Sequence, residues 1–184
     1  MVRIIGKKII YYQEVDSTNQ EAKRQIKAGL GEGGVVVADY QTKGKGKPGR
    51  NWFSPPGMGV YLSAVIKPFR NPSDLAPLTL LGAKSVASAI KKISGLEPTI
   101  KLPNDVLLNH KKVSGILVER MSSGHVILGI GVNLNHPPGS FPHHLRETAT
   151  SLKIESKKGY QVKEFVKVLV SELDREYLAY LRRI

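Results

Sequence analysis

The chain has 184 residues, of which 41% are hydrophobic and 23% are charged. These values are typical of a globular protein with a substantial core, exclude a disordered chain, and predict one domain over residues 1–184. Cysteine is absent, which excludes disulfides, thiolate metal sites and a cysteine nucleophile. The formal net charge of +13 favours an anionic partner or substrate, such as nucleic acid, ATP or an acidic protein.

The amino-terminal stretch predicts a strand followed by a helix. Residues 8–15, KIIYYQEV, are β-branched and aromatic, as is typical of a strand. The next stretch, DSTNQEAKRQIKAG, predicts a helix with Ser17 or Thr18 as its N-cap and its last glycine as the stop. Gln20 or Glu21 would complete a capping box.

The middle of the chain predicts two buried strands and a long helix. The apolar runs at residues 33–40 and 59–68 indicate the strands, with a glycine-rich segment between them. Residues 73–95 place Ala, Leu and Val at helical spacing, and Gly95 would end this helix. Throughout the chain, no apolar run approaches the ~20 residues that a membrane span needs, so we expect a cytoplasmic protein.

Short strands and a final helix complete the predicted order. The strands are expected at residues 99–102, 106–108, 112–120 and 125–135. Residues 161–183 predict an amphipathic helix with one apolar stripe, formed by Phe165, Leu169, Leu173, Tyr177 and Tyr180. Consecutive strands with helices set apart from them predict an α+β fold built on a mixed, largely antiparallel sheet with flanking helices.

The segment QTKGKGKPGRNW, residues 41–52, combines glycines with basic side chains. Backbone N–H groups of such a loop can approach phosphate oxygens closely. It is not a P-loop, because Arg50 and Asn51 stand where that motif requires Lys and Ser or Thr. Trp52 follows directly and indicates a flap with a buried hinge and a movable tip. A solvated basic surface loop is the alternative interpretation.

Three further stretches carry polar residues at strand ends. They are VDSTN at the first strand–helix junction, KLPNDVLLNHKKVSGILVE, and GIGVNLN. The histidines of NHPPGSFPHH, by contrast, are separated by prolines and do not predict a metal site, so we expect a surface loop there.

Together with the glycine-rich loop, these stretches resemble the catalytic domain of the biotin protein ligase family. The resemblance implies a fold similar to that of class II aminoacyl-tRNA synthetases. It also implies two steps: biotin and ATP form biotinyl-adenylate and pyrophosphate, and a lysine of a biotin carboxyl carrier protein domain then takes the biotinyl group.

The resemblance also implies roles for individual residues. Biotin would be contacted by Ser17, Thr18, Asn19, Gln41, Lys45, Gly46, Lys47, Lys112 and Gly115. ATP would be contacted by Lys45, Lys47, Arg50, Trp52, Lys101, Asn104, Gly129 and Asn133. Lys112, Lys47 and Asp105 would act in catalysis, and Asp105 would help to hold Mg²⁺ or orient the incoming lysine.

Each of these residues has a plainer structural interpretation. Ser17 and Thr18 could simply cap a helix, Lys112 could be a surface lysine, the PND sequence is favourable turn chemistry, and Gly129 could be an ordinary strand glycine. The combination of motifs in one order favours the functional interpretation.

The chain departs from the family pattern at several points. Many members have arginines where Lys45 and Lys47 stand, and Leu102 replaces the tryptophan usual in KWPND. Lysine keeps the charge but loses the bidentate fork of arginine. The small β-barrel that members commonly carry after the last helix is not expected here. The helix-turn-helix of repressor-type members is not expected either, so we expect no specific DNA binding. A homodimer is possible.

Two other classes of protein remain as alternatives. A lipoate–protein ligase-like enzyme would share the fold, although the cysteine-dependent transferases are excluded by composition. A basic nucleic-acid-binding protein would explain the positive charge without any catalysis.

Overall fold

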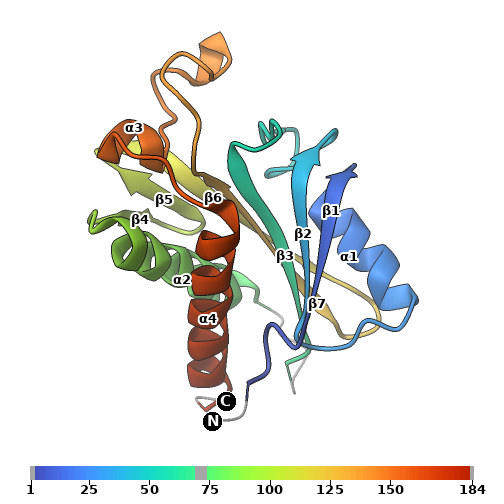
Figure 1. Ribbon diagram of the computed structural model, residues 1–184. Coiled ribbons are helices and arrows are strands. Elements are labelled where there is room, and N and C mark those ends of the chain that lie inside the picture. The colour runs from blue at the N-terminus through green and yellow to red at the C-terminus, as the bar shows by residue number, and fades with distance from the viewer. Residues whose placement is uncertain (1–2, 69–73, 183–184) are drawn as a thin grey trace.

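The computed structural model describes residues 3–68 and 74–182. In these residues one sheet has the strand order β1-β2-β3-β7-β6-β5-β4 (Figure 1). Its strands are β1 (Lys8–Val15), β2 (Gly34–Gln41), β3 (Gly59–Ile66), β4 (Thr99–Lys101), β5 (Asp105–Leu108), β6 (Lys111–Arg120) and β7 (Val126–Asn133). Only β1 and β2 pair in parallel, and helix α1 (Thr18–Lys27) connects them. All other neighbouring strands are antiparallel. The predicted α+β fold with a mixed, largely antiparallel sheet is confirmed.

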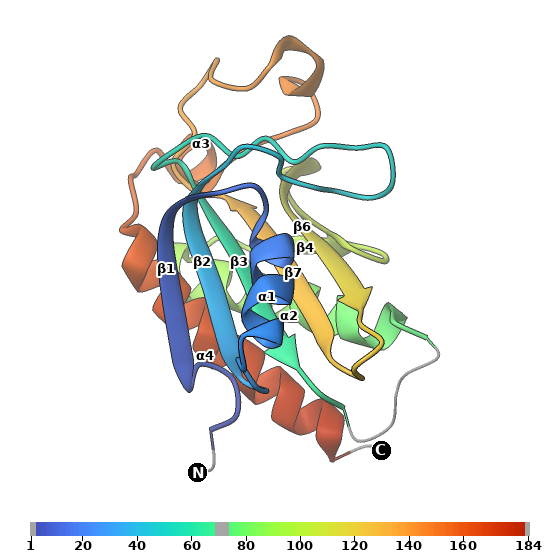
Figure 2. The same ribbon diagram turned by 90° about the vertical axis from the view of Figure 1, so that its right-hand side faces the viewer.

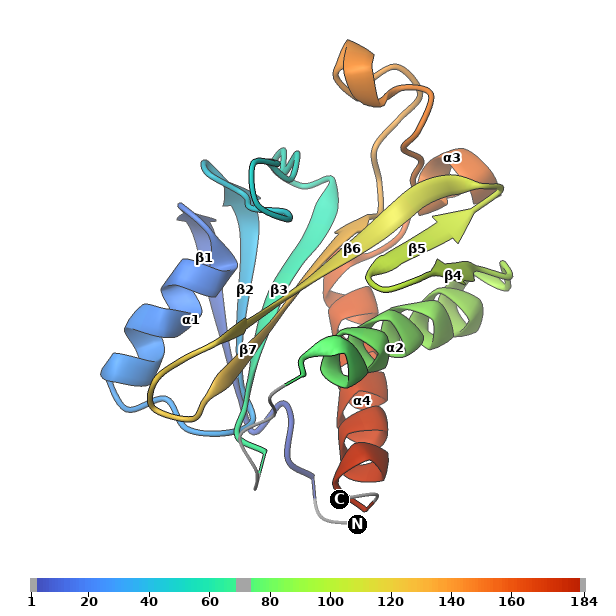
Figure 3. The ribbon, with the colours of Figure 1, turned by 180° about the vertical axis from the view of Figure 1, so that it is seen from behind.

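Helices cover both faces of the sheet. α2 (Ala76–Ser94) and α4 (Val162–Leu181) pack together on one face, and α1 lies on the other (Figures 1 and 3). The predicted stripe of α4 is buried except for Tyr180, which is half-buried against the same core. No helix in residues 3–68 and 74–182 combines the length and apolar character needed to cross a membrane.

The two faces carry separate cores. A large apolar core lies beneath α2 and α4, and a smaller one beneath α1 joins Ala22 to Val36, Val65 and Ile127. Because β2, β3 and β7 are covered on both sides, their sequences are nearly continuous apolar runs.

Helix ends differ in part from the predictions. Ser17 occupies the N-cap position of α1, but its side chain makes no capping hydrogen bond, so the predicted capping box is wrong. The Thr18 N–H is bonded instead to Gln41 of a neighbouring strand. Gly95 ends α2 in the left-handed conformation (φ 73°), as predicted. The predicted limits of α2 at Ser73 and of α4 at Arg183 lie outside the described residues.

Two short elements were not predicted: the 3-10 helix η1 (His143–Leu145) and α3 (Leu152–Ser156). Ser151 caps α3 by accepting a hydrogen bond from the Ile154 N–H at 3.1 Å. The segment between β7 and α3 rises from the same end of the sheet as the β2–β3 loop and the amino end of α1 (Figure 2). Loops far apart in sequence thus meet at this end.

Candidate active site

A cavity of about 720 Å³ opens at this end of the sheet. Its walls come from the amino end of α1, the loop after β2, strands β5 to β7 and the segment before α3. Every site residue predicted from the sequence lines this one cavity: Ser17, Thr18, Asn19, Gln41, Lys45, Gly46, Lys47, Arg50, Trp52, Lys101, Asn104, Asp105, Lys112, Gly115, Gly129 and Asn133. The structure brings these residues together, while their individual roles stay predictions.

The floor of the cavity is a chain of buried hydrogen bonds. The Gln41 side-chain oxygen accepts from the Thr18 N–H at 2.8 Å and lies 3.2 Å from the Thr18 hydroxyl. The Ser63 hydroxyl lies 2.8 Å from the Thr18 hydroxyl and 2.6 Å from Asn19 Oδ1. Gln41 Nε2 donates to Ser54 Oγ at 2.8 Å, which ties the floor to the loop. These groups are held in place before any ligand arrives.

Asn19 joins this floor to a charged pair at the surface. Its Nδ2 donates to Glu119 Oε2 at 2.6 Å, while Lys23 Nζ lies 2.7 Å from Glu119 Oε1. Burial would raise the pKa of Glu119, but the hydrogen bonds from Lys23 and Asn19 outweigh burial and lower that pKa. Asn19 lies directly over Gly129, where an added Cβ would come within 2.3 Å of Asn19 Oδ1. Gly129 therefore makes room for this amide.

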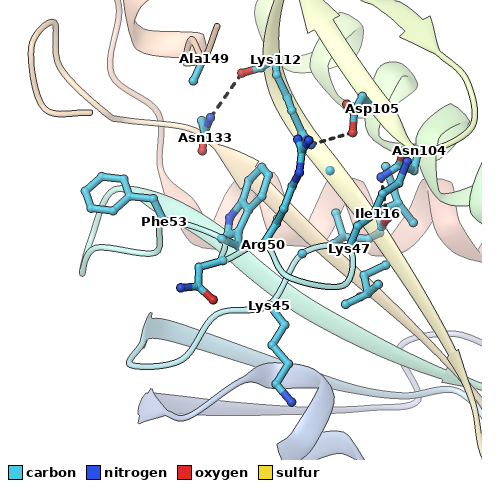
Figure 4. Close-up of a pocket in the computed structure, with 18 of the residues that line it drawn as sticks. Lys45, Lys47, Arg50, Phe53, Asn104, Asp105, Lys112, Ile116, Asn133 and Ala149 are labelled. Carbon is cyan, nitrogen blue, oxygen red and sulfur yellow. Dashed lines mark hydrogen bonds and ion pairs between the residues drawn. The ribbon is translucent and has the colours of Figure 1, made fainter. Parts of the chain in front are cut away.

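Lys112 and Asp105 form an ion pair on the opposite wall. Lys112 Nζ lies 2.7 Å from Asp105 Oδ1, and the pair is partly open to solvent (Figure 4). The same ammonium lies 5.5 Å from the centre of the Trp52 ring, within the range of a cation–π interaction. In the register of the β5–β6 hairpin, Asp105 faces Gly115, and the Lys112 side chain passes over this glycine to reach the carboxylate.

The loop after β2 is anchored at its base and exposed at its tip. Gly44 and Ser54 are buried, and the Trp52 N–H donates to the Gly44 carbonyl at 2.9 Å. At the tip, Lys47 and Arg50 are exposed. The predicted buried hinge is confirmed, although movement of the tip stays a prediction. Because the loop joins two antiparallel strands, the exclusion of a P-loop also holds.

Lys45 is also exposed, but its side chain extends away from the Lys112–Asp105 pair (Figure 4). Its charge contributes to the lowered pKa of Glu119. The loop therefore spreads its cations over the mouth of the cavity instead of directing them all to one point.

The Trp52 indole lies across two glycines of the central strands. An added Cβ at Gly131 would come within 2.4 Å of the ring, and one at Gly115 would come within 3.0 Å. The indole Nε1 is buried and makes no hydrogen bond with the part of the chain that the structure describes. A buried donor without a partner is costly, so this N–H is available to a ligand.

Two asparagines hold the cavity walls together. Asn104 Nδ2 donates to the Ile116 carbonyl at 3.3 Å, and Asn133 Nδ2 donates to the Thr150 carbonyl at 2.9 Å. The latter bond fixes the segment before α3 beside β6, where Lys112 also pairs with Ala149. Both side chains therefore have a structural role in addition to any contact with a ligand.

The expectation of a surface loop around the histidines is wrong for His136. This side chain is fully buried and stacks on Phe141, with ring centroids 4.7 Å apart, while Phe53 lies 5.9 Å away. Burial lowers the pKa of His136 to about 4. His143 and His144 are exposed, as expected. The aromatic neighbours of His136 line the cavity, so the histidine supports its wall.

Sequence reasoning missed several lining residues, among them Gly131, Ile116, Phe53, Phe141 and Glu147. Gly131 had a usable signal, because side chains on a strand alternate between faces and Gly131 shares a face with Gly129. Ser63, which supports the floor, is a lone polar residue in the apolar run of β3. Phe141 and Glu147 follow a break in regular structure and carried no comparable signal.

Metal ligands are sparse here. Residues 3–68 and 74–182 contain no group of three or more His, Asp or Glu side chains that could hold a metal ion. Among the described residues, two carboxylates line the cavity, Asp105 and Glu147, and Asp105 is already paired with Lys112. This donor set fits a Mg²⁺ ion held mainly by the phosphates of a nucleotide, because Mg²⁺ in such sites needs only one or two protein carboxylates.

An α+β fold with helices on both faces of its sheet, whose glycine-rich loop and polar floor meet in one cavity, defines a class of ligand-binding domain, and comparison with known proteins identifies it. Residues 11–133 match the biotin/lipoate A/B protein ligase family. The chain belongs to this family.

Individual relatives agree with this assignment. The bifunctional ligase/repressor BirA of Bacillus subtilis is 39% identical over 153 residues, which cover 81% of this chain and 47% of that protein. The biotin–[acetyl-CoA-carboxylase] ligase of Paracoccus denitrificans is 39% identical over 129 residues, covering 67% of this chain and 53% of that protein. The chain thus spans about half the length of these curated relatives.

A solved structure shows the same architecture. The biotin protein ligase from Aquifex aeolicus in complex with biotin and ATP superposes with a TM-score of 0.86 at 34% identity. The match covers 96% of this chain and 72% of that one.

Proposed function

We propose that this chain is an ATP-dependent biotin protein ligase. In the first step it forms biotinyl-adenylate from biotin and ATP, and in the second it transfers the biotinyl group to a lysine of a biotin carboxyl carrier protein domain. The observation that carries the proposal is the convergence of every predicted site residue on one cavity with a fixed polar floor and a cationic mouth. Family membership and a relative solved with biotin and ATP support it.

The floor suits the neutral head of biotin. A ureido ring offers N–H donors and a carbonyl acceptor, and Ser17, Thr18 and Asn19 supply hydroxyl and amide groups that pair with both kinds. The Gln41 amide already bonds Thr18 and Ser54, so its principal role in this proposal is to keep Thr18 in place.

The cations suit the charged part of the reaction. A biotin carboxylate oxygen attacks the α-phosphorus of ATP, the bond to the β-phosphate bridge breaks, and pyrophosphate leaves. Like-charge repulsion opposes this approach, and positively charged groups that stabilise the developing charge offset the repulsion. Lys112 would turn from Asp105 to the reacting oxygens, while Lys47 and Arg50 would follow the phosphates as the loop closes.

Mg²⁺ would accompany the nucleotide, with Asp105 as its protein ligand. When bound, it would screen phosphate charge and polarise the phosphoryl group. The departure of Lys112 from Asp105 would leave this carboxylate free for the ion in the first step and for the incoming lysine in the second.

The second step releases AMP. The unprotonated amine of the carrier lysine attacks the acyl carbon of the adenylate, the acyl–phosphate bond breaks, and AMP leaves. In this proposal Asp105 would accept the amine proton. The closed loop would exclude water from the mixed anhydride until the carrier arrives.

Incubation with biotin, ATP and Mg²⁺ tests this proposal. Pyrophosphate release with biotin, and labelling of a carrier domain when one is added, is the expected result. Release with lipoate or octanoate but not with biotin would instead favour a lipoate ligase-like activity within the same family.

The positive charge also raises the possibility of nucleic-acid binding. We propose only non-specific binding, because phosphate contacts alone carry no sequence information. Affinity for duplex DNA should then fall steeply with salt, and a sequence-specific footprint at physiological salt would contradict this. We also propose that the enzyme acts in the cytoplasm, where ATP is available, and that it could form a homodimer.

A further inference from the structure

Glu119 closes the GILVE sequence at the end of β6, yet the reaction proposed above gives it no part. Its side chain is only 27% exposed. One carboxylate oxygen accepts from Asn19 Nδ2 at 2.6 Å and the other meets Lys23 Nζ at 2.7 Å. Asn19 belongs to the cavity floor, so the charged carboxylate of Glu119, which lies outside the floor, contacts an amide that is part of it.

The floor hydrogen bonds are self-consistent in two opposite directions. With Asn19 Oδ1 toward Ser63, the serine donates its only proton to that oxygen and accepts from the Thr18 hydroxyl. With the amide turned over, Asn19 would donate to Ser63, which would donate to Thr18. A hydroxyl can donate or accept a hydrogen bond, so the hydroxyls of Thr18 and Ser63 fit both directions and do not select between the two.

The carboxylate of Glu119 does select one orientation of Asn19, and the Leu117 carbonyl, 3.5 Å from Asn19 Nδ2, adds a weaker preference for the same orientation. An ionised carboxylate is an acceptor only, so it requires the Nδ2 end of Asn19 to face it. Turning the amide over would place Oδ1 against a negative charge. Asn19 Oδ1 must therefore face Ser63, as the 2.6 Å contact shows.

We propose that Glu119, paired with Lys23, is a positioning residue that fixes the direction of the floor hydrogen bonds and so presents Asn19 to the ligand as an acceptor. This inference rests on the proposed function in naming the ligand as biotin. Oδ1 has a second lone pair beyond its bond to Ser63, and a ureido N–H is the donor that would use it. Glu119 thereby sets specificity for a ligand head that donates.

Glu119→Gln tests the proposal with almost no change in shape. Lys23 would draw the new carbonyl oxygen toward itself, which leaves the new NH₂ group facing Asn19 and turns the Asn19 amide over. The Kd and KM for biotin should rise roughly tenfold, because the binding-competent orientation becomes a minor one. The kcat at saturating biotin should stay within about twofold, since Lys112 and Asp105 are untouched.

Lys23 supplies two further variants. Lys23→Met keeps the carboxylate and should leave biotin affinity within about twofold. Adding Lys23→Met to Glu119→Gln removes the bias on the new amide and should recover part of the lost affinity. Glu14→Gln makes the same chemical change on an exposed residue of β1 and should change nothing.

A ligand analogue separates positioning from simple loss of structure. Where one ureido N–H of biotin is replaced by a ring oxygen, one of the two regioisomers should bind the parent protein more weakly than biotin. In Glu119→Gln the affinity difference between biotin and this analogue should be smaller. The N–H that the analogue lacks would no longer find Asn19 Oδ1 as its acceptor in this variant. Equal weakening of biotin and both analogues by Glu119→Gln would overturn the proposal.

The orientation of Asn19 is also measurable without any ligand. In the parent protein its side-chain NH₂ resonances in ¹H–¹⁵N spectra should show slow solvent exchange, and Glu119→Gln, unlike Glu14→Gln, should shift them. Unchanged resonances in Glu119→Gln would contradict the proposal. If the parent protein binds no biotin, the proposed function fails, while these resonances still decide how Glu119 orients Asn19.

Discussion

The floor and the loop of the cavity are polar in different ways. On the floor, Thr18, Asn19 and Ser63 are buried and bonded to one another or to Gln41 and Glu119. In the loop, Lys47 and Arg50 are exposed, and backbone hydrogen bonds such as Gly46 N–H to the Arg50 carbonyl at 2.9 Å give the loop its shape. The floor has lost its side-chain entropy on folding, whereas the loop loses its own on binding. In the proposed reaction, the groups that would bind the neutral head of biotin are therefore ordered before binding, whereas those that would bind phosphate are not.

Lys112 lies between these regions, and its removal should have the largest effect. In the proposed mechanism, Lys112→Ala deletes a charge that acts mainly on the transition state, so adenylation should slow by about 10²- to 10³-fold. Biotin affinity should change much less, because the floor is independent of this side chain. Single-turnover pyrophosphate release and calorimetric biotin binding measure the two effects.

Lys111→Ala is the matched control, since it removes the same charge one residue away on the other face of β6. Lys111→Ala should adenylate biotin at the rate of the parent protein. Normal turnover by Lys112→Ala as well would return Lys112 to the status of a surface lysine.

The contact between floor and loop can be broken at Gly131. In Gly131→Ala the new Cβ would meet the Trp52 ring at 2.4 Å and displace it. Overpacking of this kind costs about 2 kcal/mol, which we expect as weaker nucleotide binding and an altered loop. Trp52 is the only tryptophan, so its fluorescence emission reports the displacement directly. Gly159→Ala, at an open position whose φ is not positive, controls for the added methyl group. An emission spectrum of Gly131→Ala identical to that of the parent protein would show that the indole does not lie over Gly131.

The wall behind the floor should be sensitive to acid. Burial holds the pKa of His136 at about 4, below the ~6.5 of an unfolded histidine. Between these values the unfolded state binds more protons, so stability falls as pH decreases through this window and is fully retained above it. In this window His136 would lower the free energy of unfolding by up to about 1.4 kcal/mol for each pH unit, and His136→Phe should remove that dependence. Urea-unfolding curves at several pH values measure it.

The slope of stability with pH, not the absolute stability, is the test of His136, because phenylalanine also changes packing. His143→Phe, at an exposed position, should leave the slope as it is in the parent protein. Asp16 titrates below the pH window of His136. The hydrogen bond from Arg24 lowers the pKa of Asp16 to about 2, so the contribution of Asp16 to stability is lost at lower pH than that of His136. An unchanged slope in His136→Phe would mean that this histidine titrates normally.

The smallest effect should come from the loop tip. If Lys47 contacts the adenylate phosphate as a single-point donor, a guanidinium in its place should favour the closed loop by about 1 kcal/mol. The parent protein should then release some adenylate and label lysines of a bystander protein that lacks a carrier domain. Lys47→Arg should label the bystander about fivefold less. Absence of bystander labelling by the parent protein, or equal labelling by both, would defeat this role for Lys47.

Residues near one another in the chain were predictable to the extent that local signals decide their structure. β1 has the predicted limits, and Gly95 ends α2 as its lack of a Cβ suggested. The glycine-rich loop was recognisable because its glycines and lysines lie in one short stretch. The capping box failed in part because the hydroxyl of Thr18, one of the two predicted caps, has the long-range partners Gln41 and Ser63 and does not cap the helix.

By itself, the sequence determined the order of strands β1 to β7 and of helices α1, α2 and α4, the mixed sheet and the motifs of the family, because hydrophobic periodicity and turn chemistry are local properties. Only the tertiary structure decided that Asn19 meets Glu119 across 100 positions, that Trp52 lies over Gly131, and that His136 is buried. The register of antiparallel strands and the packing of loops at one end of the sheet create these contacts. No local pattern encodes them, because each depends on the energy of the whole packed arrangement.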